Sequence, residues 1–339
     1  MIKFVANKAP DMTRIATLLL RCKEENQWAN CGPLYHQLAS DYSDHFALPP
    51  DRVVTPCANA GIALEAMARR LAQIAKRPLR WVGSAFSFQN LARGYFSDMK
   101  LVDCTPEGLM DLNAVRSLDA DSFDGIIVVN PFGHFQDFSA YIRFAQETGK
   151  NLLFDNAAGV DTTIPDWSWQ AFSLHHTKPY GVGEGGLAIT PAQEAAPLYA
   201  LLNYGPVPEN PSDWLNNGKL SDITCAFLID RLEKAPTWRT EFFQQAARVV
   251  DIATSLGLQT LRPFGDASPA TSWAFIAPKP IPLERIMNSP VLTLGKYYKP
   301  LAHLPNTVRL FDHLVNIPTH PDVAQLSDKV LKATIAAVL

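Results

Sequence analysis

Two patterns of hydrophobic and polar residues alternate over the first two-thirds of the chain. Short apolar runs without polar alternation, rich in β-branched residues, predict buried strands. These runs span residues 52–55, 80–83, 100–103, 125–130 and 152–155. Apolar residues at helical spacing predict helices over residues 61–75, 112–118 and 138–148. Buried strands separated by helices predict an α/β fold with a mostly parallel central sheet covered by helices on both faces.

The last third of the chain has a different pattern. An irregular loop rich in proline and asparagine is predicted at residues 203–218. Two helices are predicted at 221–234 and 237–256, and the second carries an apolar stripe from Phe242 to Ala253 that is typical of a core face. A strand-like run at 271–276, an apolar run at 310–317 and an amphipathic helix at 321–339 follow. We therefore expect a large α/β domain over residues 1–235 and a small C-terminal α+β domain over residues 236–339.

Composition excludes several classes of protein. The 30 Lys and Arg residues nearly balance the 33 Asp and Glu residues, so a nucleic-acid partner is not expected. Hydrophobic residues make up 47% of the 339 positions, as in an ordinary globular protein. No run of about 18 apolar residues is present, so no membrane span is expected, and the lack of an apolar leader favours the cytoplasm. The five cysteines contain no C-x-x-C pair, which argues against a disulfide framework and a zinc site.

Three glycines, Gly181, Gly183 and Gly186, satisfy the G-x-G-x-x-G pattern of dinucleotide-binding proteins. That fingerprint must follow a strand and open a helix, because the helix N-terminus receives the pyrophosphate. Here a loop containing Lys178 precedes the glycines, and the strand-like residues 186–190 follow them. The context therefore excludes a nicotinamide site.

Lys178 lies among small and hydrogen-bonding residues rather than on a charged face. A desolvated lysine can form a Schiff base with an aldehyde cofactor such as pyridoxal 5′-phosphate. That cofactor also needs a carboxylate at its pyridinium nitrogen and donors for its phosphate. Asp155 ends an apolar strand, where open α/β sheets place ligands, and one further strand fits between Asp155 and Lys178. The two side chains are therefore expected in a common crevice.

Three segments in this region resemble the DegT/DnrJ/EryC1 family of pyridoxal-phosphate-dependent sugar aminotransferases, which have fold type I. They are Asp-Asn-Ala-Ala at 155–158, Phe-Ser-Leu-His-His-Thr-Lys at 172–178 and Gly-Glu-Gly-Gly at 183–186. The family pattern runs E-D-x-A-[QH], F-S-[FL]-H-x-x-K and G-E-G-G in the same order. Weaker similarity at 32–33, 217–222 and 297–301 extends the resemblance over most of the chain.

The resemblance implies a role for each matching residue. Lys178 would form the internal aldimine and carry the proton between the substrate Cα and the cofactor, and Asp155 would keep the pyridinium protonated. Ser173 would donate to the phosphate. The remaining implied cofactor contacts are Ala60 and Gly61 at the start of a helix, the stacking aromatic Phe88, with Phe86 as the alternative, and Asn217. Asn217 would reach the phosphate of a neighbouring subunit, which implies a homodimer with shared active sites.

Four positions depart from the family pattern. Ala60-Gly61 replaces a Gly-Thr pair and so removes a hydroxyl donor to the phosphate. Ala158 stands where the family has Gln or His, Phe154 replaces the acidic residue before the aspartate, and Lys219 replaces an arginine. These changes weaken contacts to cofactor or substrate but keep Lys178 and Asp155.

The expected activity is transfer of an amino group from an amino acid such as L-glutamate to a keto-sugar, expected to be nucleotide-linked. Two alternatives remain: a pyridoxal-phosphate-dependent sugar dehydratase or lyase, and a degenerate family member with a binding or regulatory role. A lysine rather than a histidine at position 178 favours transamination, whereas Ala60 and Ala158 motivate the degenerate reading. No metal is expected, because His175 and His176 would point to opposite sides of an extended segment.

Overall fold

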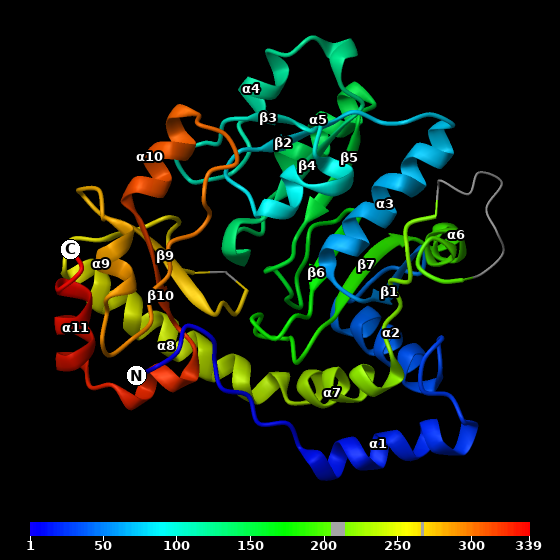
Figure 1. The fold of residues 1–339 in the computed structure, drawn as a ribbon, viewed down its shortest axis with the longest axis horizontal. Helices are drawn as coiled ribbons and strands as arrows, with labels where there is room; N and C mark the ends of the chain where they lie inside the picture. Colours follow the sequence, from blue (N-terminus) through cyan, green and yellow to red (C-terminus); the bar gives the residue numbers. More distant parts are fainter. Residues whose placement is uncertain (205–213, 266–267) are drawn as a thin grey trace.

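The computed structural model describes residues 1–204, 214–265 and 268–339, and part of the loop predicted at 203–218 lies outside these ranges. A seven-stranded sheet forms the centre of the N-terminal part (Figure 1). Its spatial order is β1 (Arg52–Cys57), β7 (Gly186–Pro191), β6 (Gln170–Ser173), β5 (Asn151–Asp155), β4 (Gly125–Val129), β2 (Trp81–Ser84) and β3 (Lys100–Val102). Only β7 runs antiparallel to its neighbours, so the predicted α/β fold with a mostly parallel sheet is confirmed.

Helices cover both faces of this sheet (Figure 1). The α-helices of the N-terminal part are α1 (Met12–Glu25), α2 (Pro33–His45), α3 (Ala60–Ala75), α4 (Leu112–Arg116), α5 (Ser139–Thr148), α6 (Ala195–Ala200) and α7 (Asp222–Glu233). Short 3₁₀ turns lie between them at η1 (Gln89–Ala92), η2 (Gly94–Phe96), η3 (Ala120–Ser122), η4 (Pro131–Gly133) and η5 (Ala192–Glu194).

Alternation along the central strands explains why both faces are covered. Ile127 and Leu153 point into a core formed with α3, whereas Ile126 and Phe154 belong to a second core formed with α5. Successive side chains of a strand face opposite sides, so a strand without polar residues must be buried on both. The unbroken apolar runs in the sequence therefore correspond to the two-sided burial seen here.

A second sheet, in the order β10 (Leu314–Pro318), β9 (Ser272–Ile276) and β8 (Gln259–Thr260), lies in the C-terminal part. Its helices are α8 (Ala235–Ser255), α9 (Leu283–Met287), α10 (Pro305–His313) and α11 (Asp328–Ala336), with a 3₁₀ turn η7 (Pro321–Gln325). Two expectations change. The apolar run 310–317 is divided between α10 and β10, and the helix predicted over 321–339 is broken, because Ser327 caps α11 by accepting from Val330 N.

Helices α7 and α8 follow each other almost without interruption along one side of the molecule (Figure 1). Trp238 and Phe242 at the start of α8 pack into the core around α1, α2 and α7. Val249 and Ala253, further along the same stripe, pack into the core of the C-terminal sheet. The boundary predicted after residue 235 thus falls at the start of a helix that contacts both parts, and the division into two domains stays a prediction.

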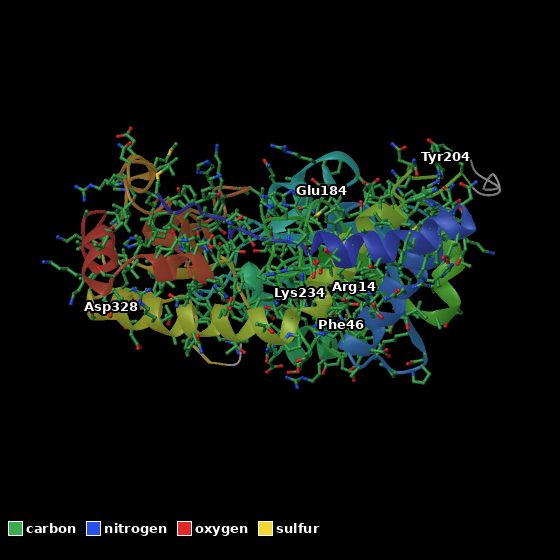
Figure 2. The ribbon with its side chains drawn as sticks, turned by 90° about the horizontal axis from the view of Figure 1, so that it is seen from below. Arg14, Phe46, Glu184, Tyr204, Lys234 and Asp328 are labelled. Atoms are coloured by element: carbon green, nitrogen blue, oxygen red, sulfur yellow. The ribbon has the colours of Figure 1, made fainter. Side chains whose placement is uncertain are left out.

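Helix α1 is attached to α7 by charged side chains. Arg14 of α1 pairs with Glu233 of α7 at 2.5 Å, and Asp11 N, at the start of α1, donates to Asp230 Oδ2 at 3.1 Å (Figure 2). Lys234 pairs with the same Asp230 carboxylate at 2.7 Å. Phe46, also labelled there, stacks on Phe172 with ring centroids 5.0 Å apart. The Phe46–Phe172 contact holds the end of α2 against β6, the strand that leads into the loop containing Lys178.

All five cysteines are free thiols, and all except Cys31 are buried. Across the residues that the structure describes, no helix is both long enough and apolar enough to cross a membrane.

Candidate functional site

The predicted site residues gather where β5 and β6 end and where β7 and α3 begin. Cys57 at the end of β1 pairs with Gly186 at the start of β7, and Gly186 pairs in turn with Ser173 at the end of β6. A Cβ atom on Gly186 would lie 2.3 Å from the carbonyl carbon of Asn59. Only glycine allows β7 to approach the start of α3 this closely.

The first turn of α3 offers unpaired backbone donors. Asn59 caps the helix by accepting from Ile62 N at 2.9 Å. The N–H groups of Ala60 and Gly61 have no acceptor among the described residues. Free N–H groups together with the helix dipole favour an anion, so this turn can hold a phosphate. A Cβ on Gly61 would lie only 3.2 Å from Asn59 Oδ1, so the missing threonine hydroxyl coincides with a crowded position.

Asp155 is the last residue of β5 and is buried, with 5% of its surface exposed. Its Oδ1 accepts from Ala157 N at 3.2 Å, and the side chain of Asn90 also hydrogen-bonds to the carboxylate. Burial raises the pKa of Asp155, while these hydrogen bonds and the charge of Lys178 act in the opposite direction. The carboxylate is thus desolvated and has few internal donors.

Lys178 lies in the loop between β6 and β7, close enough to Asp155 for their charges to act on each other's pKa. Burial lowers the pKa of Lys178, and the charge of Asp155 partly offsets this effect. Within the described ranges its ε-amino group has no hydrogen-bond partner. The structure therefore brings together the two residues predicted to carry the chemistry, and the amine is free to react.

The backbone of the lysine loop is closely constrained. Leu174 N donates to Gly185 O at 2.8 Å and His176 N to Gly183 O at 2.7 Å, which closes the loop before β7 begins. A Cβ on Gly181 would lie 2.1 Å from the carbonyl oxygen of His175, so glycine is required there. The glycine motif leads into a strand rather than a helix, as expected from its sequence context.

The two histidines of the loop lie closer together than an extended segment would allow. The segment turns after His175, and the rings of His175 and His176 are 5.7 Å apart instead of on opposite sides. His175 Nε2 lies 3.4 Å from Glu184 Oε1, and its Nδ1 is 2.8 Å from Thr177 Oγ1. No group of three or more His, Cys, Asp or Glu side chains in the described part of the chain could hold a metal ion.

Ser173 is buried at the end of β6, beside the start of α3. Its Oγ accepts from His175 N at 3.2 Å, which fixes the side chain but leaves its hydroxyl proton to be donated elsewhere. Ser173 and the first turn of α3 can therefore contact the same anion.

The structure separates the two candidate stacking rings. Phe86 is completely buried among Cys104, Leu310 and Leu314, so its faces are covered by protein. Phe88, two residues later, is 52% exposed and ends the extended segment just before η1. Phe88 is therefore the ring that is free to contact a ligand.

Asn217 is exposed, next to the start of α3. The following residue, Gly218, accepts from Ala58 N at 2.8 Å and donates to Leu202 O at 2.9 Å. Asn217 N itself donates to Asn216 Oδ1 at 2.7 Å. The backbone of this segment is thus fixed, while the Asn217 side chain lies on the surface of the chain.

Two further site residues were not found from the sequence. Asn90, in η1, bonds to Asp155 from a distant part of the chain. The ring of Tyr298 stacks on Phe132 at 4.8 Å and meets the edge of Phe88 at 6.5 Å, and its hydroxyl accepts from Phe132 N at 3.3 Å. Burial raises the pKa of Tyr298, and so does the charge of Asp155. Tyr298 lay in a segment of weak family resemblance, whereas Asn90 gave no signal.

Phe154, one of the departures from the family pattern, points away from the site. Its ring packs against Phe138 at 5.1 Å in the core on the opposite face of the sheet from α3. Because neighbouring residues of a strand face opposite sides, the residue before Asp155 cannot share its environment. This substitution therefore leaves the site unchanged.

Comparison with known proteins identifies the family. The sequence model of the DegT/DnrJ/EryC1/StrS aminotransferase family matches residues 19–277, more than half of the chain. The protein belongs to this family. Protein Rv3402c of Mycobacterium tuberculosis strain H37Rv is 27% identical over 249 residues, which cover 68% of this chain and 60% of that protein. The chain thus spans well under two-thirds of that relative's length.

Solved structures of this family share the fold. A DegT/DnrJ/EryC1/StrS aminotransferase from Brucella abortus superposes with a TM-score of 0.81, at 19% identity, over 96% of this chain and 95% of its own. DesI, solved in the presence of its TDP-sugar product, gives a TM-score of 0.80 at 18% identity over 97% and 90% of the two chains. At these identities the likeness establishes fold type I, which confirms the predicted fold.

Proposed function

We propose that this protein is a pyridoxal-phosphate-dependent aminotransferase that moves an amino group from an amino acid, with L-glutamate as the expected donor, to a nucleotide-linked keto-sugar. The observation that carries the proposal is the placement of Lys178, in the loop that follows β6, beside Asp155 at the end of the neighbouring strand β5. Family membership supports the reaction class and the cofactor.

The residues present fit the cofactor. Asp155 is a desolvated carboxylate that would gain a cationic partner in the pyridinium nitrogen. The free N–H groups of Ala60 and Gly61, with the hydroxyl of Ser173, would hold the phosphate, and Phe88 would lie against the ring. When bound, pyridoxal phosphate supplies an aldehyde for amine capture and a ring that accepts electrons from the substrate Cα.

Lys178 and Asp155 would move and hold the protons of the reaction. Burial lowers the pKa of Lys178, which favours the neutral amine that a nucleophile and a base require. Lys178 Nζ would take the proton from the Cα of the amino-acid donor and deliver it to the cofactor, and in the second half-reaction it would carry a proton in the reverse direction to the acceptor carbon. Asp155, once paired with a cation, stays ionised and holds the proton on the ring nitrogen.

The substrate class and the assembly are part of this proposal. DesI was solved with a TDP-sugar, which supports a nucleotide-linked substrate here. We further propose a homodimer, in which the exposed Asn217 reaches the phosphate of the neighbouring subunit. The Asn217 side chain lies on the surface beside the first turn of α3 and makes no hydrogen bond with any described residue of its own chain, which suits this arrangement.

The test begins with the cofactor. Purified protein titrated with pyridoxal phosphate should develop the visible absorbance of a lysine-bound cofactor, and Lys178→Ala should abolish it, whereas Lys23→Ala, on the exposed surface of α1, should not. Glutamate should then convert the cofactor to its amine form, and a keto-sugar nucleotide should restore it.

Three outcomes would contradict parts of the proposal. Absence of any cofactor binding would favour the degenerate, non-catalytic alternative. Binding without conversion by any amino acid would favour a lyase. A monomer in sedimentation that retains full activity would refute the shared active site.

A further inference from the structure

The main chain around Lys178 is held from outside the lysine loop. Lys8 Nζ donates to the carbonyl oxygens of His176, Lys178 and Gly181. Thr271 Oγ1 donates to Thr177 O at 2.7 Å, and Arg231 Nε donates to Pro179 O at 2.8 Å. Every carbonyl from residue 176 to 179 therefore has a donor that belongs to another segment of the chain.

Lys8 is the centre of this arrangement. An ammonium group has three protons, and here three carbonyl oxygens receive them. Among the described residues no carboxylate contacts Lys8, so its role is to satisfy backbone oxygens rather than to form an ion pair. The titratable side chains that interact electrostatically with Lys8 are Arg231, His176 and His320, all of them basic. Burial and Arg231 lower the pKa of Lys8 to about 7.

Residues 1–8 form an N-terminal arm that is attached to the C-terminal part of the molecule and ends at Lys8. Ile2 bridges to Leu292, and His320 Nε2 donates to Lys3 O at 3.0 Å. Asn7 N donates to Asp322 Oδ2 at 2.7 Å. In Figure 1 the arm leaves the C-terminal elements and runs towards α1. The arm thus joins the C-terminal part to the loop that carries Lys178.

We propose that Lys8 is a positioning residue that fixes the backbone of Lys178 so that its amine meets the cofactor aldehyde beside Asp155. This proposal rests on the proposed function. Lys8 does not touch the cofactor site itself; it acts through the peptide groups on both sides of Lys178. The N-terminal arm thereby makes covalent attachment of the cofactor depend on contacts with the C-terminal part.

The affinities for two forms of the cofactor distinguish a positioning role of Lys8 from a general effect on protein stability. Pyridoxal phosphate requires the Lys178 amine, whereas pyridoxamine 5′-phosphate uses the same ring and phosphate contacts but has no aldehyde. In Lys8→Met, pyridoxal phosphate should bind about tenfold or more weakly. Pyridoxamine phosphate should bind within about twofold of the unaltered protein. Lys8→Arg should recover part of the loss, and Lys23→Met, which removes an exposed lysine, should change neither affinity.

Amide hydrogen exchange in the cofactor-free protein provides a second measurement. Residues 174–185 should exchange faster in Lys8→Met than in the unaltered protein, with little change in the central strands. Should Lys8→Met fail to fold, Lys8→Gln, which keeps two N–H donors, takes its place in both measurements.

The outcomes separate the two proposals. Equal losses for both cofactor forms, or no loss for either, would overturn the role of Lys8. A protein that binds neither form would refute the proposed function, and the exchange of residues 174–185 would then decide on Lys8 alone: unchanged exchange would overturn its role, and selectively faster exchange would support it.

Discussion

Two buried aspartates lie at opposite ends of two neighbouring strands in the middle of the central sheet, and their environments differ. Asp124 precedes β4, and Asp155 ends the neighbouring strand β5. Each is less than one-tenth exposed. Hydrogen bonds from Arg80 and Arg77 lower the pKa of Asp124, whereas burial raises the pKa of Asp155. An aspartate carboxylate is thus paired with two arginines at the amino end of β4 and has few partners at the carboxyl end of β5.

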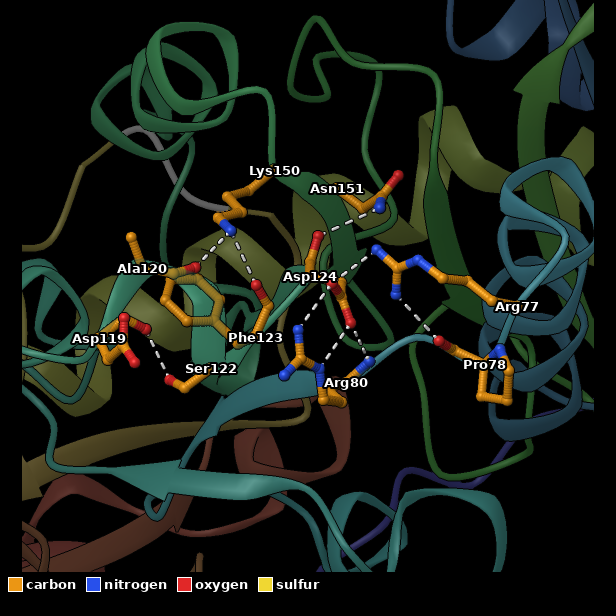
Figure 3. Close-up of polar contacts among 10 residues, drawn as sticks. All are labelled: Arg77, Pro78, Arg80, Asp119, Ala120, Ser122, Phe123, Asp124, Lys150 and Asn151. Carbon is orange, nitrogen blue, oxygen red and sulfur yellow. Dashed lines mark hydrogen bonds and ion pairs between the residues drawn. The ribbon is translucent and has the colours of Figure 1, made fainter.

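Asp124 is the centre of a closed polar network (Figure 3). Its Oδ2 accepts from Arg80 N at 2.8 Å and from Arg80 Nε at 3.0 Å, and its Oδ1 accepts from Arg77 Nη2 at 2.8 Å. Asn151 Nδ2 donates to its carbonyl oxygen at 3.1 Å, and Lys150 Nζ donates to Phe123 O at 2.8 Å. This carboxylate has its partners within the fold and therefore stabilises it.

The two environments indicate a structural role for Asp124 and a ligand-binding role for Asp155. A buried carboxylate that lacks a cation costs stability, so such a group persists where a ligand completes it. Among the described residues, Asp155 has donors only from Ala157 and Asn90, and its neighbouring charge is the amine of Lys178. A carboxyl end of parallel strands that holds an incompletely paired charge is the expected position for a cofactor.

The largest expected effect is on activity. Asp155→Asn should lower kcat/KM by about 10²–10⁴-fold, because the cofactor ring loses the charge that keeps it protonated. The free energy of unfolding of the cofactor-free protein should stay the same or rise, since a neutral amide costs less to bury. Steady-state kinetics and urea unfolding measure the two quantities. A large loss of stability would remove the contrast with Asp124.

Asp124→Asn should show the reverse pattern. Its loss weakens the bonds from Arg77 and Arg80 and should lower the free energy of unfolding by about 1–3 kcal/mol. Affinity for pyridoxal phosphate should remain unchanged. Asp98→Asn, at an exposed position, is the matched control. A defect in cofactor binding without a stability change would contradict the structural role.

The pH dependence of the free energy of unfolding should also differ between the two carboxylates. The pKa of Asp124 is lowered in the folded state, so its stabilisation is present above the unfolded value of about 3.8 and disappears as the pH falls below it. The stability gap between the unaltered protein and Asp124→Asn should therefore narrow progressively as the pH falls below about 4. The raised pKa of Asp155 predicts the opposite sign, because protonation on acidification relieves the cost of its burial. Urea unfolding at several pH values tests both.

The smallest expected effect concerns Asn90. Asn90→Ala removes a side-chain hydrogen bond to Asp155 and should weaken pyridoxal phosphate binding by about 2- to 10-fold. Gln89→Ala, at the exposed neighbouring position, should leave the affinity unaltered. If both variants behave alike, Asn90 does not orient the carboxylate.

The core of the site followed from residue order. A strand end followed by a loop of small residues predicted that Asp155 and Lys178 would meet, and the family resemblance added Ser173. The exclusion of a dinucleotide site depended on a strand after Gly186, and β7 confirms that strand. The break within residues 321–339 was missed because a 3₁₀ turn and a short helix have similar apolar spacing.

Contacts between segments that are distant in the sequence could not be predicted. Asn90 and Lys8 are ordinary polar residues in the sequence, and only the fold brings them to Asp155 and to the loop of Lys178. The choice between Phe86 and Phe88 also needed the fold, because both rings occupy similar sequence contexts but only Phe86 is enclosed by α10 and β10. Spacing along a strand gives the face of a side chain but not the segment that covers it.

The sequence by itself determined the alternation of buried strands and helices, the strand ends at which the candidate site lies, and the proximity of a lysine to an aspartate. These properties depend on local periodicity and on the direction of parallel strands. Only the tertiary structure decided which buried aspartate is neutralised by arginines, and which backbone oxygens Lys8 binds. Burial and charge at a residue are set by segments far away in the chain, and only their packing shows whether a polar group finds its partner within the protein or must find it in a ligand.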